Sequence, residues 1–149
     1  INESDIVIGS VSRLKRQDQI VRALKLFNRP EIKVLFVGIK QGHFDDLCVE
    51  LGIKNKIIYA GEAPPDVVLN YYKLLNINIL PSISEGFGLV LLEAMALETP
   101  LIATQFGGIL DIIVNEKNGL LFTDGDIHQL SNCINRLLTD KKLRESIIS

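Results

Sequence analysis

Short apolar runs alternate with segments of helical spacing along the whole chain. Runs bounded by turn residues such as Gly, Pro and Asn indicate strands, whereas apolar residues three and four positions apart indicate amphipathic helices. The predicted strands are Ile6–Val11, Ile32–Gly38, Lys56–Gly61, Ile77–Leu80, Pro100–Thr104 and Leu120–Phe122. The predicted helices are Asp18–Phe27, Phe44–Leu51, Pro64–Leu75, Leu89–Leu97, Asp126–Leu138 and a last one from Asp140, and the apolar segment Ile109–Val114 precedes the sixth strand.

This alternation predicts an α/β fold, a Rossmann-like parallel sheet of about six strands with helices on both faces. In such sheets, ligands bind outside the carboxyl ends of the strands. The loops expected at that edge are Ser12–Gln17, Gly38–Gly42, Gly61–Pro65, Ser82–Gly88 and Gln105–Gly108.

Composition narrows the class of protein. The 149 residues suit one domain, and 47% of them are hydrophobic, which is enough for a substantial core. With 16 basic and 18 acidic residues evenly mixed, there is no basic stripe for nucleic acid. Cys48 and Cys133 belong to no CxxC pair and indicate buried thiols in a reducing compartment, so we expect a cytoplasmic protein. The chain starts directly before a strand and stops inside a helical pattern, so we expect a single domain, residues 1–149, of a longer protein.

Three cations follow the first predicted strand. Arg13, Lys15 and Arg16 lie within four residues, at the edge where a ligand would bind. Cations in such a loop suit a diphosphate, because guanidinium and ammonium groups donate charge-assisted hydrogen bonds to phosphate oxygens. The alternative is an ordinary solvated basic loop.

The stretch after the fourth strand carries two glycines and two acids. Gly86 and Gly88 precede a helix, and the backbone N–H groups at a helix N-terminus can bind an anion. Glu93 is the one polar residue between Leu89 and Leu97, so we expect the helix to be buried on most sides and Glu93 to require a partner. A carboxylate binds a pair of neighbouring hydroxyls well, which points to a ligand as the partner instead of another side chain. The alternatives are an exposed loop acid for Glu85 and a buried ion pair for Glu93.

The spacing of these two acids resembles a known signature. Glu85 and Glu93 are separated by seven residues, and the stretch resembles the E-x7-E motif of retaining, GT-B-type glycosyltransferases of family 4, also called group 1. Three further segments resemble motifs of that family in the same order: Ser12-Arg13-Leu14 with Lys15, Thr99–Thr104 with Gly107-Gly108-Ile109, and Asn118–Leu121 with Gly125-Asp126. The resemblance covers nearly the whole chain and only the C-terminal, donor-binding half of the two-domain GT-B fold.

The resemblance implies a role for each matching position. Arg13 and Lys15 would contact the diphosphate of a nucleotide-sugar donor, and Glu93 would bind the ribose hydroxyls. Glu85 would be the catalytic-site acid that contacts the transferred sugar. The amides of Phe87, Gly88 and Leu89 would hold sugar and phosphate oxygens, and the loop after Tyr59 would cover the base.

Two departures from the family pattern affect these roles. The loop between Arg13 and Lys15 is about three residues shorter than usual, so Arg16 is an alternative to Lys15 as the second diphosphate contact. Asp111 stands where the family usually has Glu, and its side chain is one carbon shorter.

The resemblance implies a retaining glycosyltransferase of hexosyltransferase type. The full protein would transfer a sugar to a glycan or lipid-linked acceptor, as in polysaccharide biosynthesis, with the acceptor site in a missing N-terminal domain. We expect no metal or other cofactor, membrane association only through the missing part, and no turnover by this domain alone. The alternatives are a non-catalytic binding or assembly module on the same fold and a nucleotide-sugar epimerase.

Overall fold

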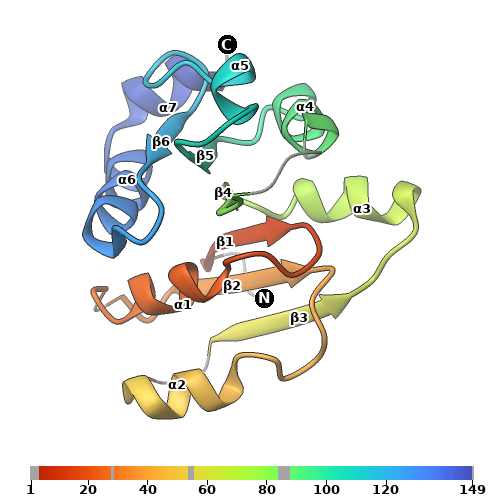
Figure 1. Ribbon diagram of the computed structural model, residues 1–149, viewed down its shortest axis with the longest axis vertical. Coiled ribbons are helices and arrows are strands. Elements are labelled where there is room, and N and C mark those ends of the chain that lie inside the picture. Colours follow the sequence, from red (N-terminus) through yellow and green to blue (C-terminus); the bar gives the residue numbers. More distant parts are fainter. Residues whose placement is uncertain (1–3, 28, 54–55, 84–87, 149) are drawn as a thin grey trace.

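The six strands in the described part of the chain join one parallel sheet. The computed structural model describes residues 4–27, 29–53, 56–83 and 88–148, and Glu85 and Phe87 lie outside these ranges. The strands are β1 (Ile6–Val11), β2 (Ile32–Val37), β3 (Ile57–Gly61), β4 (Ile77–Leu80), β5 (Leu101–Thr104) and β6 (Leu120–Phe122). Their order across the sheet is β3-β2-β1-β4-β5-β6, and every pair is parallel (Figure 1). The prediction of a Rossmann-like α/β sheet is therefore confirmed.

Helices cover both faces of this sheet. They are α1 (Asp18–Leu24), α2 (Asp45–Leu51), α3 (Pro65–Tyr72), α4 (Gly88–Ala96), α5 (Ile109–Ile112), α6 (Ile127–Thr139) and α7 (Lys141–Ile148). One core layer joins the sheet to α1, α2, α6 and α7, and the other joins it to α3, α4 and α5. Figure 1 shows this division, with α6 and α7 on the left and α3 and α4 on the right. The two layers use alternate residues of each strand, as the pleat requires.

The strand order fixes where a ligand can bind. The chain builds β1, β2 and β3 outward in one direction, and α3 then carries it back so that β4 pairs with the other side of β1. This reversal places a crevice at the carboxyl ends of β1 and β4, which is where open α/β sheets bind their ligands.

Among the described residues, two core side chains, those of Ser10 and Asn78, have polar atoms without a hydrogen-bond partner. Asn78 of β4 pairs with Gly9 of β1 and has no solvent exposure. Within the described part of the chain, neither its amide nitrogen nor its amide oxygen has a partner. A buried, unsatisfied polar group costs roughly 1–3 kcal/mol.

We therefore predict that Asn78→Leu raises the free energy of unfolding by about 1–3 kcal/mol, because leucine fills a similar volume without polar atoms. Urea denaturation measures this change. Asn76 provides the control, since its side-chain oxygen accepts a hydrogen bond from the Val7 amide at 2.7 Å. Asn76→Leu should lower stability, and a comparable loss in Asn78→Leu would contradict the prediction.

Candidate nucleotide site

The basic loop lies at the carboxyl end of β1, as predicted. Arg13 and Lys15 are exposed, and Arg13 lines a hollow described below. Arg16, the alternative to Lys15 as the second diphosphate contact, forms an ion pair: its Nε donates to Asp124 Oδ1 at 2.7 Å, and this hydrogen bond raises the pKa of the guanidinium.

The last residue of the predicted loop Ser12–Gln17 is a buried glutamine that organises the loop. Gln17 has no solvent exposure. Its side-chain nitrogen donates to Ser12 Oγ at 2.9 Å and to the Arg13 carbonyl at 3.0 Å, and its side-chain oxygen accepts from the Lys15 amide at 2.6 Å. No sequence signal marks this role, because glutamine next to a helix start is usually exposed.

A second buried glutamine ties the loop to the turn between β6 and α6. Gln19 donates to the Arg16 carbonyl at 3.3 Å and to Asp124 Oδ1 at 3.0 Å, and its oxygen accepts from the Gly125 amide at 2.7 Å. Together with the Arg16–Asp124 ion pair, these contacts hold the outer side of the basic loop.

Two adjoining hollows lie at the carboxyl ends of β1, β2 and β3. The first, of about 280 Å³, is lined by Val11–Arg13, Val37 and Gly38, Glu62 and Ala63, and Val68 of α3. The second, of about 410 Å³, is lined by Leu14, Gly38–Lys40, His43, Gly61 and Glu62. Gly38 and Glu62 line both hollows, which are together called the recess below, and the lining includes the charged residues Arg13, Lys40 and Glu62. The loops after β1, β2 and β3 thus meet in one site, as the sheet predicted.

Close backbone packing holds this recess together. Gly38 adopts a φ of +100°, and an added Cβ atom there would lie 2.5 Å from the Ser12 carbonyl oxygen. The Gly38 amide donates to the Gly61 carbonyl at 2.7 Å, and the Ser12 amide donates to the Val37 carbonyl at 3.0 Å. The loops after β1, β2 and β3 are therefore positioned by one another.

Glu93 has a side-chain partner, so the expectation of a ligand as its sole partner is wrong. The Tyr72 hydroxyl of α3 lies 3.3 Å from Glu93 Oε2 and 3.4 Å from the Val90 carbonyl oxygen, and it can donate to either. Tyr72 is fully buried, and its burial, with the nearby charge of Glu93, raises the pKa of the phenol, which therefore remains a proton donor. The partner is thus a neutral phenol, neither a ligand alone nor the ion pair of the alternative.

The predicted burial of α4 is also wrong. Leu91 and Ala94 are buried, but Leu92 is 54% exposed and Glu93 is half-buried. Leu92 and Ala96 are both exposed, so part of the surface of α4 is uncovered. Glu93 is thus partly exposed beside Tyr72, and it does not line either of the two hollows described above.

The remaining predicted site residues are placed only in part. Helix α4 begins at Gly88, one residue before the predicted start at Leu89, so the backbone of both residues belongs to its first turn. Glu85 and Phe87, the other two members of the predicted loop, lie outside the described residues. Asp111, the departure from the family pattern, is exposed on α5.

The loop after β5 is a tight turn. Gly107 has a φ of +48°, and the Phe106 amide donates to the Thr104 carbonyl at 2.9 Å. The adjacent glycines thus serve the turn that starts α5.

The described residues contain neither a metal-binding cluster nor a membrane-spanning helix. No group of three or more His, Cys, Asp or Glu side chains there is arranged to hold a metal ion. None of the helices in the described ranges is long and apolar enough to cross a bilayer. Cys48 and Cys133 are both buried and unbridged, as predicted.

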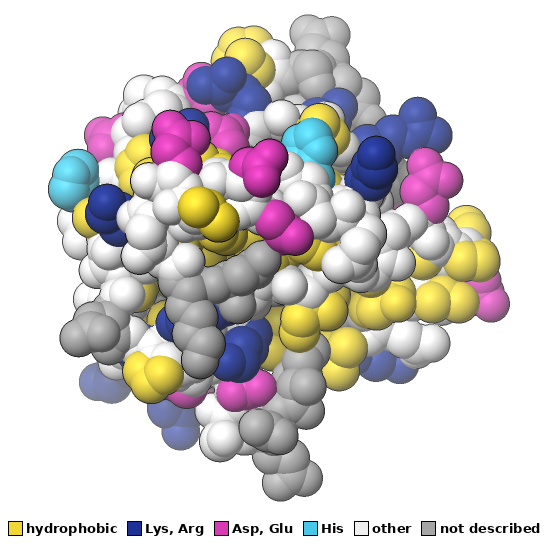
Figure 2. Space-filling view, turned by 90° about the horizontal axis from the view of Figure 1, so that it is seen from below, with side chains coloured by type: hydrophobic (Ala, Val, Ile, Leu, Met, Phe, Trp, Pro, Cys, Tyr) yellow, Lys and Arg dark blue, Asp and Glu magenta, His cyan; other side chains and the backbone are white. Residues whose placement is uncertain are grey.

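The face in Figure 2 shows acidic and basic side chains interspersed, with apolar side chains gathered toward its right.

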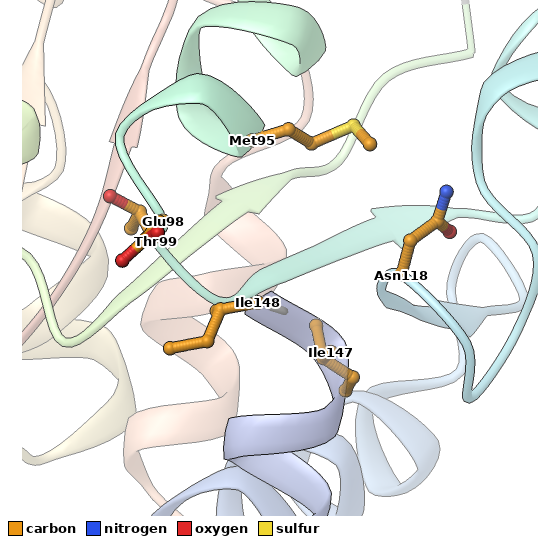
Figure 3. A pocket seen from close by; sticks show the side chains of 6 residues that line it. All are labelled: Met95, Glu98, Thr99, Asn118, Ile147 and Ile148. Carbon is orange, nitrogen blue, oxygen red and sulfur yellow. The ribbon is translucent and has the colours of Figure 1, made fainter.

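A small cavity lies at the opposite end of the sheet. Its volume is about 100 Å³, and Figure 3 shows the side chains that line it: Met95, Glu98, Thr99, Asn118, Ile147 and Ile148. Thr99 comes just before β5, so this cavity is at the amino ends of the strands, away from the recess.

The fold and the recess define a class of protein, the Rossmann-like domains, in which ligands bind at the carboxyl edge of a parallel sheet. The family model for "Glycosyl transferases group 1" matches residues 1–149, and the chain belongs to this family. The resemblance found in the motifs is thereby confirmed.

Among curated relatives, the chain is 30% identical to an uncharacterized glycosyltransferase of Methanocaldococcus jannaschii, over 97% of this chain and 38% of that protein. It is 38% identical to the capsular polysaccharide biosynthesis glycosyltransferase CapM of Staphylococcus aureus, over 96% of this chain and 39% of that protein. The chain therefore spans about two fifths of the length of these relatives.

Solved structures match the fold over the same extent. Sucrose-phosphate synthase of Thermosynechococcus elongatus has a TM-score of 0.87 at 27% identity, over 100% of this chain and 40% of that one. Anabaena HepE in complex with UDP-glucose has a TM-score of 0.84 at 27% identity, over 97% of this chain and 42% of that one. The C-terminal domain of the group 1 protein LpcC from Francisella tularensis has a TM-score of 0.81 at 27% identity, over 97% of this chain and 80% of that one. The sheet is thus that of a GT-B C-terminal domain.

Proposed function

We propose that this chain is the donor-binding domain of a glycosyltransferase that takes a sugar from a nucleoside diphosphate sugar. The observation that carries the proposal is the recess between the basic loop and α3, at the sheet edge where this class of fold binds nucleotides. The similar HepE structures contain UDP, UDP with glucose, or UDP-glucose, which supports a nucleotide-sugar ligand.

Different site residues bind the diphosphate, the base and the ribose of the donor. Arg13 and Lys15 bind the diphosphate, and the base lies in the recess beside Glu62. Glu93 accepts from the ribose hydroxyls, since a carboxylate can accept from two neighbouring hydroxyls. Val68 and Tyr72 are one turn apart on α3, so this helix both lines the recess and holds Glu93.

The loop before α4 and the first turn of α4 bind the transferred sugar. Glu85 contacts the transferred sugar as the catalytic-site acid, and the amides of Phe87, Gly88 and Leu89 bind sugar and phosphate oxygens. The positive end of the α4 dipole, with Arg13 and Lys15, stabilises the charge that develops on the leaving diphosphate. This arrangement supplies the required charge without a metal or other cofactor.

The reaction of the longer protein belongs to the same proposal. Transfer proceeds with retention, as the E-x7-E resemblance implies, to a glycan or lipid-linked acceptor held by an N-terminal domain. The two free, buried thiols support a reducing compartment, the cytoplasm. A donor screen on the full-length protein, read by mass spectrometry, tests the transfer, and hydrolysis or transfer of no donor would favour a non-catalytic module.

We predict that UDP, GDP or ADP binds this domain weakly and that Arg13→Gln weakens the binding roughly tenfold or more, because a hydrogen bond between charged groups contributes about 1.5–3 kcal/mol. Arg16→Gln is the matched control. Its guanidinium pairs with Asp124 and is partly exposed, so its loss should change affinity less than about threefold. Calorimetry or an NMR titration measures both. Absence of binding at millimolar nucleotide, or equal effects of the two variants, would count against the assignment.

A further inference from the structure

We propose that Gln17 is a positioning residue of the diphosphate site, fixing the loop from which Arg13 and Lys15 project. The inference rests on the proposed function, because it assumes that these two cations bind a diphosphate. It adds a residue that does not itself touch the ligand.

The contacts of Gln17 all serve the loop. Its side chain uses both N–H groups and its oxygen, reaching Ser12, Arg13 and Lys15 at 2.9, 3.0 and 2.6 Å. These three bonds link positions on both sides of the exposed Leu14. One buried side chain thus sets the backbone on either side of the turn.

The Gln17 side chain makes no capping hydrogen bond to the adjacent helix α1. Gln17 occupies the N-cap position of α1, where polar side chains usually accept from first-turn amides, yet it makes no such bond. Its amide group is turned back toward the basic loop. The residue is therefore placed to shape the loop and not to stabilise the helix start.

Fixing the loop matters because its cations are exposed and their side chains are long. Arginine and lysine lose considerable rotamer and backbone freedom when they order around a ligand, and a preformed loop reduces that loss. A neutral amide suits this task, since it can donate and accept without lowering the positive charge of the loop. A carboxylate at the same position would lose both donors and place negative charge beside the cations.

The outer side of the loop has a separate anchor. Gln19 and the Arg16–Asp124 pair attach it to the turn between β6 and α6. Gln17 therefore holds the part of the loop that carries Arg13 and Lys15, the two cations assigned to the ligand. Gln19 holds the part that carries Arg16, which is not assigned to it.

The test compares nucleoside diphosphate with the bare nucleoside. We expect Gln17→Met to weaken UDP, GDP or ADP binding roughly tenfold, the equivalent of about 1.4 kcal/mol, with no change for the corresponding nucleoside. Gln17→Glu should weaken diphosphate binding further. A purely structural role would lower the affinity for both ligands alike.

Asn118 provides the matched control. Its side chain also bonds to the backbone twice, accepting from the Val114 amide at 2.8 Å and donating to the Ile112 carbonyl at 2.9 Å. It lies at the small cavity at the other end of the sheet (Figure 3). Asn118→Leu should lower the melting temperature without altering diphosphate affinity.

The outcomes separate the two proposals. If the unaltered protein binds no nucleoside diphosphate, the proposed function is wrong and the inference falls with it. If it binds and Gln17→Met binds equally well, or loses diphosphate and nucleoside to the same extent, only the inference is overturned. Should Gln17→Met fail to fold, Ser12→Ala removes the hydroxyl that accepts a hydrogen bond from Gln17. This variant should lose less affinity for the nucleoside diphosphate and none for the nucleoside. An unchanged affinity for the diphosphate would overturn the inference.

Discussion

Gly38→Ala is expected to lower the free energy of unfolding by about 2–6 kcal/mol and to abolish measurable nucleotide binding. The first cause is steric, because the added Cβ atom would lie 2.5 Å from the Ser12 carbonyl oxygen and 2.8 Å from the Ser12 carbonyl carbon. Both atoms are backbone, so no side chain can turn away, and such overpacking costs roughly 1–3 kcal/mol. The second cause is the φ of +100°, which costs a non-glycine residue about another 1–3 kcal/mol.

The effect on binding follows from which atoms must move. Ser12 and Arg13 start the basic loop, and the Arg13 amide would lie 3.2 Å from the new Cβ atom. Relief of the clash displaces the loop that carries Arg13 and opens the recess that Gly38 lines. Denaturant titration gives the stability, and nucleotide titration at a temperature where the variant is folded gives the binding.

Gly52→Ala is the control for this substitution. Gly52 ends α2 with a φ of +67°, and no heavy atom lies within 4 Å of an added Cβ there. This variant should lose only about 1–2 kcal/mol from backbone strain and keep its nucleotide affinity. If Gly38→Ala and Gly52→Ala are equally stable and bind equally well, the close packing of the three loops does not govern the site.

The strands were predictable because their signals are local. β1 and β4 have the predicted bounds, since each is a short apolar run that ends at a loop of polar residues or Pro. The helices α1 and α3 end three residues earlier than predicted, at Leu24 and Tyr72. Apolar residues beyond these ends, in the connecting segments, still pack on the core. The helical spacing of apolar residues therefore continues past the end of each helix, and the predicted helices are too long.

The site was predictable only where one segment carries the signal. Arg13 and Lys15 lie at the expected edge because their place follows from the strand before them. The partner of Arg16 is Asp124, which is 108 positions away, and no local pattern relates the two. Likewise, the acid at Glu93 was an evident anomaly in α4, but its phenol partner comes from another helix. Hydrogen-bond partners that depend on the packing of separate elements require the folded structure.

Glu93→Ala is expected to weaken nucleoside diphosphate binding by roughly tenfold or more, because hydrogen bonds to a charged group contribute about 1.5–3 kcal/mol. The loss should vanish with the 2′,3′-dideoxy nucleotide, which lacks the hydroxyls that Glu93 is assigned to accept from. Tyr72→Phe removes the hydroxyl at 3.3 Å from Glu93 and should cause a smaller loss, also confined to the ribose form.

A double variant shows whether the two residues act together. Groups in one hydrogen-bond network do not contribute additively, so Glu93→Ala with Tyr72→Phe should bind the ribonucleotide no more weakly than Glu93→Ala alone. Because Tyr72 is fully buried, each variant is first compared by urea denaturation, and affinities are measured only where it is folded. Equal losses for ribose and dideoxyribose nucleotides would assign Glu93 to the packing of α4 against α3. An unchanged affinity for the ribonucleotide would remove Glu93 from the ligand site altogether.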